Sequence, residues 1–79
     1  MIARLTGKII KTNDESVIID VNSVGYLVFC STKTLEATSQ NEVISLLIET
    51  HVREDHIHLY GFFEEPEQNC FKILTTVQG

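Results

Sequence analysis

Residues 52–62 of this chain have the sequence VREDHIHLYGF, which predicts a β-hairpin with an acidic tip. Glu54 and Asp55 are adjacent at the turn, and the residues after them alternate with the period of two that is typical of a strand. One face of that strand holds Ile57, Leu59 and Gly61, and the other holds His58, Tyr60 and Phe62. A tip that projects negative charge is suited to keeping phosphates apart rather than to gripping them.

Four further strands are predicted on the N-terminal side of this one. They cover residues 1–12, 17–21, 25–30 and 42–52, and the hairpin strand itself covers 56–62. Gly7 falls inside the first strand, where it indicates a bulge or a sharp bend. Residues 31–41 are polar and predict a loop or a short helical turn. Five short strands with a bend in the first favour an all-β fold, a small five-stranded OB-fold barrel, with an SH3-like barrel as the alternative.

A C-terminal helix is predicted after the barrel. Pro66 suits the first helical turn, and nearby glutamates suit its positive end. One apolar face is expected from Cys70, Phe71, Ile73, Leu74 and Val77. The predicted division is therefore a barrel over residues 1–63 and a helix over 64–79.

The charge of the chain limits its partners. With 79 residues, six Lys and Arg against eleven Asp and Glu, and a net charge of −5, it is one small acidic domain. A general grip on nucleic acid needs a basic face, so this composition argues against one. No apolar run approaches the roughly 18 residues of a membrane helix, and strand-like alternation begins at the N-terminus. We expect a cytoplasmic protein with no membrane partner.

No catalytic constellation is visible in the sequence. Cys30 and Cys70 match no metal or redox spacing, and buried free thiols are favoured over a disulfide. There is no Gly-rich phosphate loop, and adjacent carboxylates at a turn are badly placed for paired acid–base work. We expect no enzyme activity and no cofactor.

The histidines and aromatic residues near the hairpin have two interpretations each. His51, His56 and His58 could hold zinc together with Asp55, but exposed or half-buried histidines are favoured and no metal is expected. Tyr60 and Phe62 could stack on bases, but packing in a core or interface is favoured because their neighbours are acidic. Leu46, Leu47 and Ile48 indicate either barrel core or a subunit interface.

Three motifs together resemble the RuvA family. Residues 1–7, MIARLTG, resemble its opening Met-Ile-Gly-x-Leu-x-Gly, and residues 20–26, DVNSVGY, resemble Asp-Val-Asn-Gly-Val-Gly-Tyr. Residues 52–55 and 59–62, VRED and LYGF, resemble its Val-Arg-Glu-Asp and Leu-Tyr-Gly-Phe. Ala3 and Ser23 stand where the family usually has glycine, and Ser23 is costly if its turn requires a positive φ.

The resemblance implies a Holliday-junction-binding, non-catalytic subunit that acts in recombination and repair. Glu54 and Asp55 would form the acidic pin, four copies of which surround the crossover in a homotetramer. For Arg53, a phosphate contact and an ordinary surface ion pair with Glu54, Asp55 or Glu49 remain equal alternatives.

The partners implied are four-way junction DNA, a RuvB-like ATPase motor and a RuvC-like resolvase. RuvA proteins continue into helix-hairpin-helix motifs, so the chain is identified as an N-terminal domain. The alternative function is an OB-fold protein–protein interaction module that binds no DNA. A single-strand-binding OB-fold is less favoured, because the chain is acidic.

Overall fold

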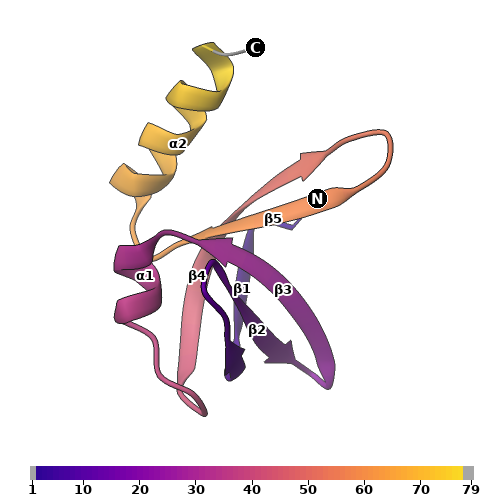
Figure 1. Cartoon of the computed structure of the whole chain (residues 1–79), viewed down its shortest axis with the longest axis vertical. Helices are drawn as coiled ribbons and strands as arrows, with labels where there is room; N and C mark the ends of the chain where they lie inside the picture. Colours follow the sequence, from indigo (N-terminus) through magenta and orange to yellow (C-terminus); the bar gives the residue numbers. More distant parts are fainter. Residues whose placement is uncertain (1, 78–79) are drawn as a thin grey trace.

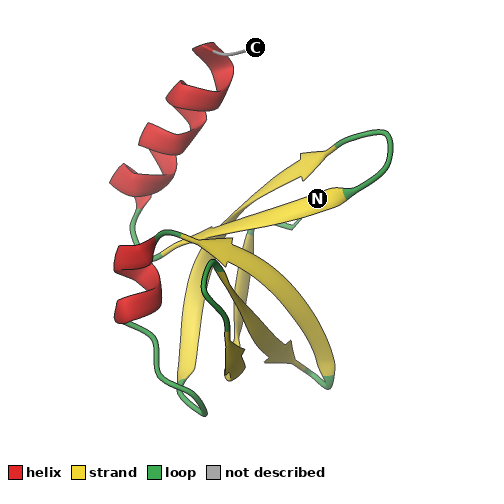
Figure 2. Ribbon diagram, viewed as in Figure 1, coloured by secondary structure: helices red, strands yellow, loops and turns green. Residues whose placement is uncertain are grey.

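The computed structural model describes residues 2–77 as a closed barrel with two helices (Figures 1 and 2). The strands are β1 Arg4–Thr12, β2 Ser16–Val21, β3 Val24–Cys30, β4 Val43–Val52 and β5 Ile57–Phe62. The helices are α1 Thr32–Glu36 and α2 Glu65–Val77. The prediction of a mostly β, five-stranded barrel followed by a C-terminal helix is confirmed.

The strands follow the order β1-β2-β3-β5-β4 around the barrel. β1 pairs with both β2 and β4 and so closes the sheet, and β3 and β5 form its one parallel pair. Because β3 and β5 run in the same direction, the chain must return to the other end of the barrel after β3. β4 makes this return on the far side of β5, and α1 lies on the connection from β3 to β4. Of the two possibilities for residues 31–41, the helical turn is therefore present, over Thr32–Glu36.

Gly7 marks the bend of β1. Residues 4–8 pair with β4, whereas residues from Lys8 onward pair with β2. A Cβ atom at Gly7 would overlap the backbone carbonyl of Asp20, so only glycine allows the strand to pass this close. The change of partner at Lys8, beside Gly7, is consistent with the predicted bend, whereas the register irregularity lies farther along, between Ile9 and Lys11.

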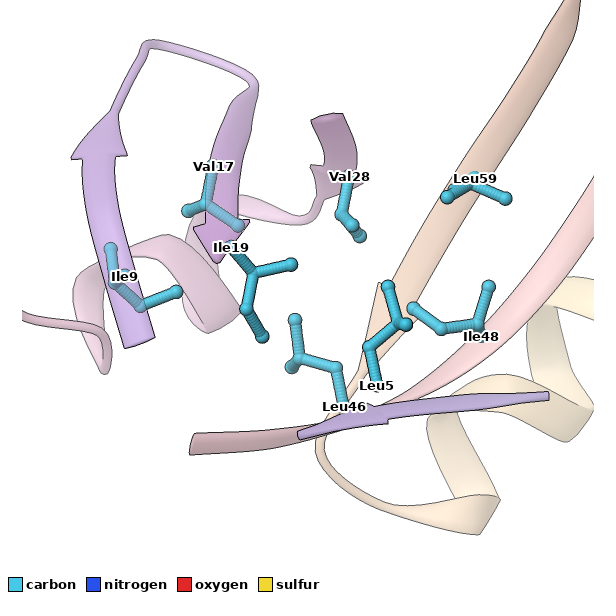
Figure 3. Packing of buried hydrophobic residues seen from close by; sticks show 8 residues of the cluster. All are labelled: Leu5, Ile9, Val17, Ile19, Val28, Leu46, Ile48 and Leu59. Carbon is cyan, nitrogen blue, oxygen red and sulfur yellow. The ribbon is translucent and has the colours of Figure 1, made fainter. Parts of the chain in front are cut away.

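The core fills the barrel with aliphatic side chains from all five strands (Figure 3). They are Leu5, Ile9, Val17, Ile19, Val28, Leu46, Ile48 and Leu59. Leu46 and Ile48 alternate with the outward Leu47, so the apolar run 46–48 places its first and last members in the core. Leu59 and Gly61, which the sequence places on one face of β5, are both buried, whereas Ile57 of the same face is exposed.

The predicted apolar face of α2 is only partly buried, which corrects the sequence interpretation. Phe71 packs on Phe62 with ring centroids 5.2 Å apart, but Ile73 and Leu74 are 64% and 58% exposed and Cys70 is exposed. Val77 lies outside the residues whose side chains the structure describes. The helix stands away from the barrel, so most of its apolar residues have no barrel surface to pack against (Figure 1).

The two cysteines differ in environment, and the expectation that both are buried is wrong for Cys70. Both thiols are free. Burial raises the pKa of Cys30 to about 11, against a smaller lowering by the backbone of Gly61. The Cys30 thiol is therefore protonated at neutral pH and behaves as a small apolar group.

Candidate nucleic-acid interface

The ends of β4 and β5 form a two-stranded ribbon that extends past the barrel (Figure 1). β1 pairs with β4 only as far as Leu47, and β3 pairs with β5 only from Leu59 onward. Beyond these points His51 pairs with His58 and Val52 with Ile57, with no third strand beside them. The ribbon, residues 51–58, therefore projects its tip away from the rest of the sheet.

The tip carries the two predicted acidic residues. The backbone N–H of Arg53 donates to the carbonyl of His56 at 2.8 Å, which closes the turn around Glu54 and Asp55. Both acidic residues are exposed, and the Asp55 side chain is 86% accessible. The carboxylates are thus directed to solvent and are available to act on a charged ligand.

Asp55 has a histidine neighbour within hydrogen-bond distance. The Nδ1 atom of His56 lies 2.8 Å from Oδ1 of Asp55, and the His56 ring stacks near that of His58 with centroids 4.1 Å apart. Glu54 has no ion-pair partner among residues 2–77.

Arg53 is exposed beside the tip and forms no ion pair within the described part of the chain. One of the acidic partners that the sequence suggested for it, Glu49, is used elsewhere. Its Oε1 atom accepts from Gln68 at 3.1 Å and lies 3.2 Å from Nζ of Lys72, both on α2. The guanidinium of Arg53 is therefore available to an external anion.

Aromatic contacts brace the base of the ribbon against the outside of the barrel. His58 lies edge-on to Phe29 of β3 with centroids 5.0 Å apart, and His51 lies edge-on to Tyr60 at 5.1 Å. Isolated two-stranded ribbons are marginally stable in water, and cross-strand aromatic pairs each add roughly 0.2–1 kcal/mol. These contacts hold the direction in which the acidic tip points.

The three histidines are not gathered into a metal site. His51 sits opposite His58 across the ribbon and faces Tyr60, whereas His56 faces Asp55. Across the described residues, no group of three or more His, Cys, Asp or Glu side chains could hold a metal ion.

Tyr60 and Phe62 pack rather than stand free. Tyr60 contacts the rings of Phe29, His51 and Phe71, and Phe62 is 8% exposed. The favoured packing interpretation therefore describes both residues.

The sequence did not single out the apolar pair behind the tip. Val52 and Ile57 face one another and are 68% and 65% exposed. Ile57 is on the strand face that is buried farther along at Leu59, and the alternation of the sequence does not distinguish the two positions. The length of the two predicted hairpin strands could have revealed its exposure. β4 and β5 continue past the last residues that pair with β1 and β3, so their ends are left uncovered.

Within residues 2–77, no helix is long and apolar enough to cross a membrane.

The acidic tip, Arg53 and the apolar pair behind the tip belong to one projecting surface. Comparison with known proteins supplies its family. The model of the RuvA N terminal domain matches residues 1–61, which include the whole barrel apart from Phe62.

The chain belongs to the RuvA N-terminal domain family.

Similar proteins cover the whole chain. The Holliday junction branch migration complex subunit RuvA of Rickettsia akari (strain Hartford) is 56% identical over 79 residues. The proteins of the same name from Rickettsia felis and Rickettsia prowazekii are each 54% identical over 79 residues. The chain spans 39% of the length of the Rickettsia akari protein and 40% of that of Rickettsia prowazekii. RuvA membership inferred from the three motifs is confirmed.

Proposed function

We propose that this chain is the N-terminal barrel of a RuvA protein and places an acidic pin at the crossover of a four-way DNA junction. The observation that carries the proposal is the exposed Glu54–Asp55 pair at the end of a ribbon that outruns its neighbouring strands. The relatives are named as subunits of a Holliday junction branch migration complex, which supplies the DNA substrate.

The physical task of the pin is repulsion. A carboxylate and a phosphate 4 Å apart repel by about 1 kcal/mol in water, and by several-fold more where solvent is excluded. Glu54 and Asp55 supply two such charges per chain, and a homotetramer would set four pairs around the crossover. Strands leaving the junction would then be biased apart. Arg53, next to the pin and without an ion pair among residues 2–77, would contact a phosphate at its edge.

The remaining functions are assigned to other segments and partners. Attraction to DNA would come from helix-hairpin-helix motifs that follow this region, and ATP-driven movement from a RuvB-like motor, with a RuvC-like resolvase acting on the same junction. The chain itself would be non-catalytic and cytoplasmic. We also assign the barrel to the OB-fold, supported by its strand order, its parallel β3–β5 pair and the helix between β3 and β4.

The decisive experiment neutralises the pin in a protein that can bind junctions. The chain replaces the matching segment of the Rickettsia akari subunit, and Glu54→Gln and Asp55→Asn are introduced together. Because both side chains are exposed, folding should be unchanged. Junction affinity should rise a few-fold, and the rate of branch migration with a RuvB-like ATPase should change.

The matched control removes the same charge elsewhere, through Glu64→Gln and Glu65→Gln at the start of α2, where both residues are exposed. The control should leave migration as it is in the parent. Equal behaviour of the two double variants would refute the pin. If the parent protein showed no preference for four-way over linear DNA, the interaction-module alternative would be favoured. Sedimentation of the same protein tests the tetramer separately.

A further inference from the structure

A second site lies away from the pin, in a pocket of about 420 Å³. It opens between the β1–β2 turn, the start of α1, the end of β5 and the first turns of α2. Four aromatic residues, Phe29, Tyr60, Phe62 and Phe71, contribute to its wall, and Asp14 and Glu15 stand at its β1–β2 turn. The proposed junction function does not use this pocket.

The aromatic wall is continuous. The rings of Tyr60 and Phe71 have centroids 4.8 Å apart, those of Phe62 and Phe71 5.2 Å, and those of Phe29 and Tyr60 5.8 Å. Faces of such rings attract a cation that lies within about 6 Å of a centroid. The protonated thiol of Cys30 also lines the pocket and adds no charge. The wall is therefore suited to a flat cationic group.

The carboxylates of Asp14 and Glu15 make the pocket negatively charged. Their turn is held in place, because Asn13 N–H donates to the carbonyl of Ser16 at 2.7 Å and Cys30 N–H donates to the carbonyl of Glu15 at 3.0 Å. Within residues 2–77, neither the Asp14 nor the Glu15 side chain forms an ion pair or a hydrogen bond. None of the described residues that line the pocket is a Lys or an Arg. A phosphate would be repelled here, whereas a cation would be attracted.

We propose that this pocket binds an arginine side chain presented by a protein partner. A guanidinium is planar, always charged, weakly hydrated and able to stack on aromatic faces while donating to carboxylates. These properties match a wall of phenyl and phenol rings with two unpaired carboxylates beside it. A nucleic-acid base could use the rings, but its phosphates would meet Asp14 and Glu15 with no cation to compensate. Charge complementarity thus selects a basic protein segment over nucleic acid.

The test measures binding of a defined probe to the 79-residue chain. Acetyl-Gly-Arg-Gly-amide is titrated into ¹⁵N-labelled protein, with the citrulline peptide as a neutral control of nearly the same shape. The arginine peptide should shift the amide signals of residues lining the pocket, and the citrulline peptide should bind at least about ten-fold more weakly. Adding 0.5 M NaCl should lower the affinity for the arginine peptide and leave the affinity for the citrulline peptide unchanged.

Matched variants separate the pocket from general acidity. Asp14→Asn with Glu15→Gln should lower arginine-peptide affinity several-fold, whereas Glu54→Gln with Asp55→Asn, which removes the same charge at the pin, should not. Signals far from the β1–β2 turn report whether the first double variant stays folded, and Glu15→Gln alone provides the second variant if it does not. Equal affinity for citrulline, equal effects of the two double variants or preferential shifts of the pocket signals by hexathymidylate would overturn the proposal.

Discussion

Ser23 adopts a backbone conformation that conflicts with its side chain. Its φ is 72°, and that of Asn22 is 51°, so the β2–β3 turn has two consecutive left-handed residues. Such turns match the twist of the two strands they join and favour Asn-Gly. Asparagine tolerates the left-handed region, whereas serine pays a steric cost from its Cβ. The chain therefore carries its strain at the position where the RuvA pattern has glycine.

Replacing Ser23 with glycine should relieve that strain. We expect Ser23→Gly to raise the free energy of unfolding by about 0.5–1 kcal/mol, after allowing for the extra freedom of glycine in the unfolded chain. Urea denaturation followed by circular dichroism measures the change. Asn22→Gly is the matched control and should gain less. A loss of stability in Ser23→Gly would contradict this account of the turn.

At the scale of an element, β1 decides whether the barrel closes. One strand must serve two partners, β4 over its first half and β2 over its second, and the sheet bends where the partners change. At that bend the backbone of Gly7 lies against the carbonyl of Asp20 with no room for a side chain. The ribbon depends on the same closure, because β4 is held at its base by β1 and by Thr50 Oγ1, which donates to the carbonyl of Ile2 at 3.0 Å.

A methyl group at the bend should weaken the barrel. Gly7→Ala should lower the free energy of unfolding by about 1–3 kcal/mol or more, because the backbone of β2 must move to admit it. Gly25→Ala provides the control, since its Cβ would lie 3.4 Å from Cγ2 of Ile18, which is ordinary contact. The control should change stability by less than about 1 kcal/mol. Thermal and urea unfolding of both variants measure the difference, and equal losses would argue against a special role for the bend.

At the scale of the whole molecule, the charge distribution separates this chain from ordinary DNA-binding domains. It has a net charge of −5 and a surface tip of two carboxylates with one adjacent arginine. Affinity for DNA comes largely from basic residues that displace counterions from phosphates. The barrel therefore lacks the electrostatic basis for holding DNA by itself, and its proposed contribution to a junction is positioning and repulsion.

The 79-residue chain should consequently bind DNA weakly. In fluorescence anisotropy at 100 mM salt, we expect no saturation with duplex, single-stranded or four-way DNA at micromolar protein. Neutralising the pin with Glu54→Gln and Asp55→Asn should change this little, because removing repulsion creates no basic surface. Tight, salt-sensitive binding to single strands would instead favour the single-strand-binding alternative.

Local patterns in the sequence were enough to predict most of the elements. Alternation located all five strands to within a few residues, because a strand with one face in a core must repeat every two positions. Gly7 indicated a bend or bulge in the first strand, and the acidic pair Glu54–Asp55 indicated the tip of the hairpin. The resemblance to RuvA then implied a specific role for that tip, the acidic pin proposed above.

Long-range packing decided what the patterns left open. Ile57 lies on the strand face that is inward at Leu59 yet is exposed, since neighbouring strands end before reaching it. Ile73 and Leu74 have helical spacing but little to pack against. Of the predicted face residues whose side chains are described, 70–74, only Phe71 lies on the rings of the barrel.

The pocket beside Asp14 and Glu15 likewise has no local signature. It unites residues from the β1–β2 turn, β3, β5 and α2, which only the closure of the sheet brings together. Sequence periodicity records which face a residue prefers. Whether a neighbour covers that face depends on where other segments end, and that is a property of the folded chain.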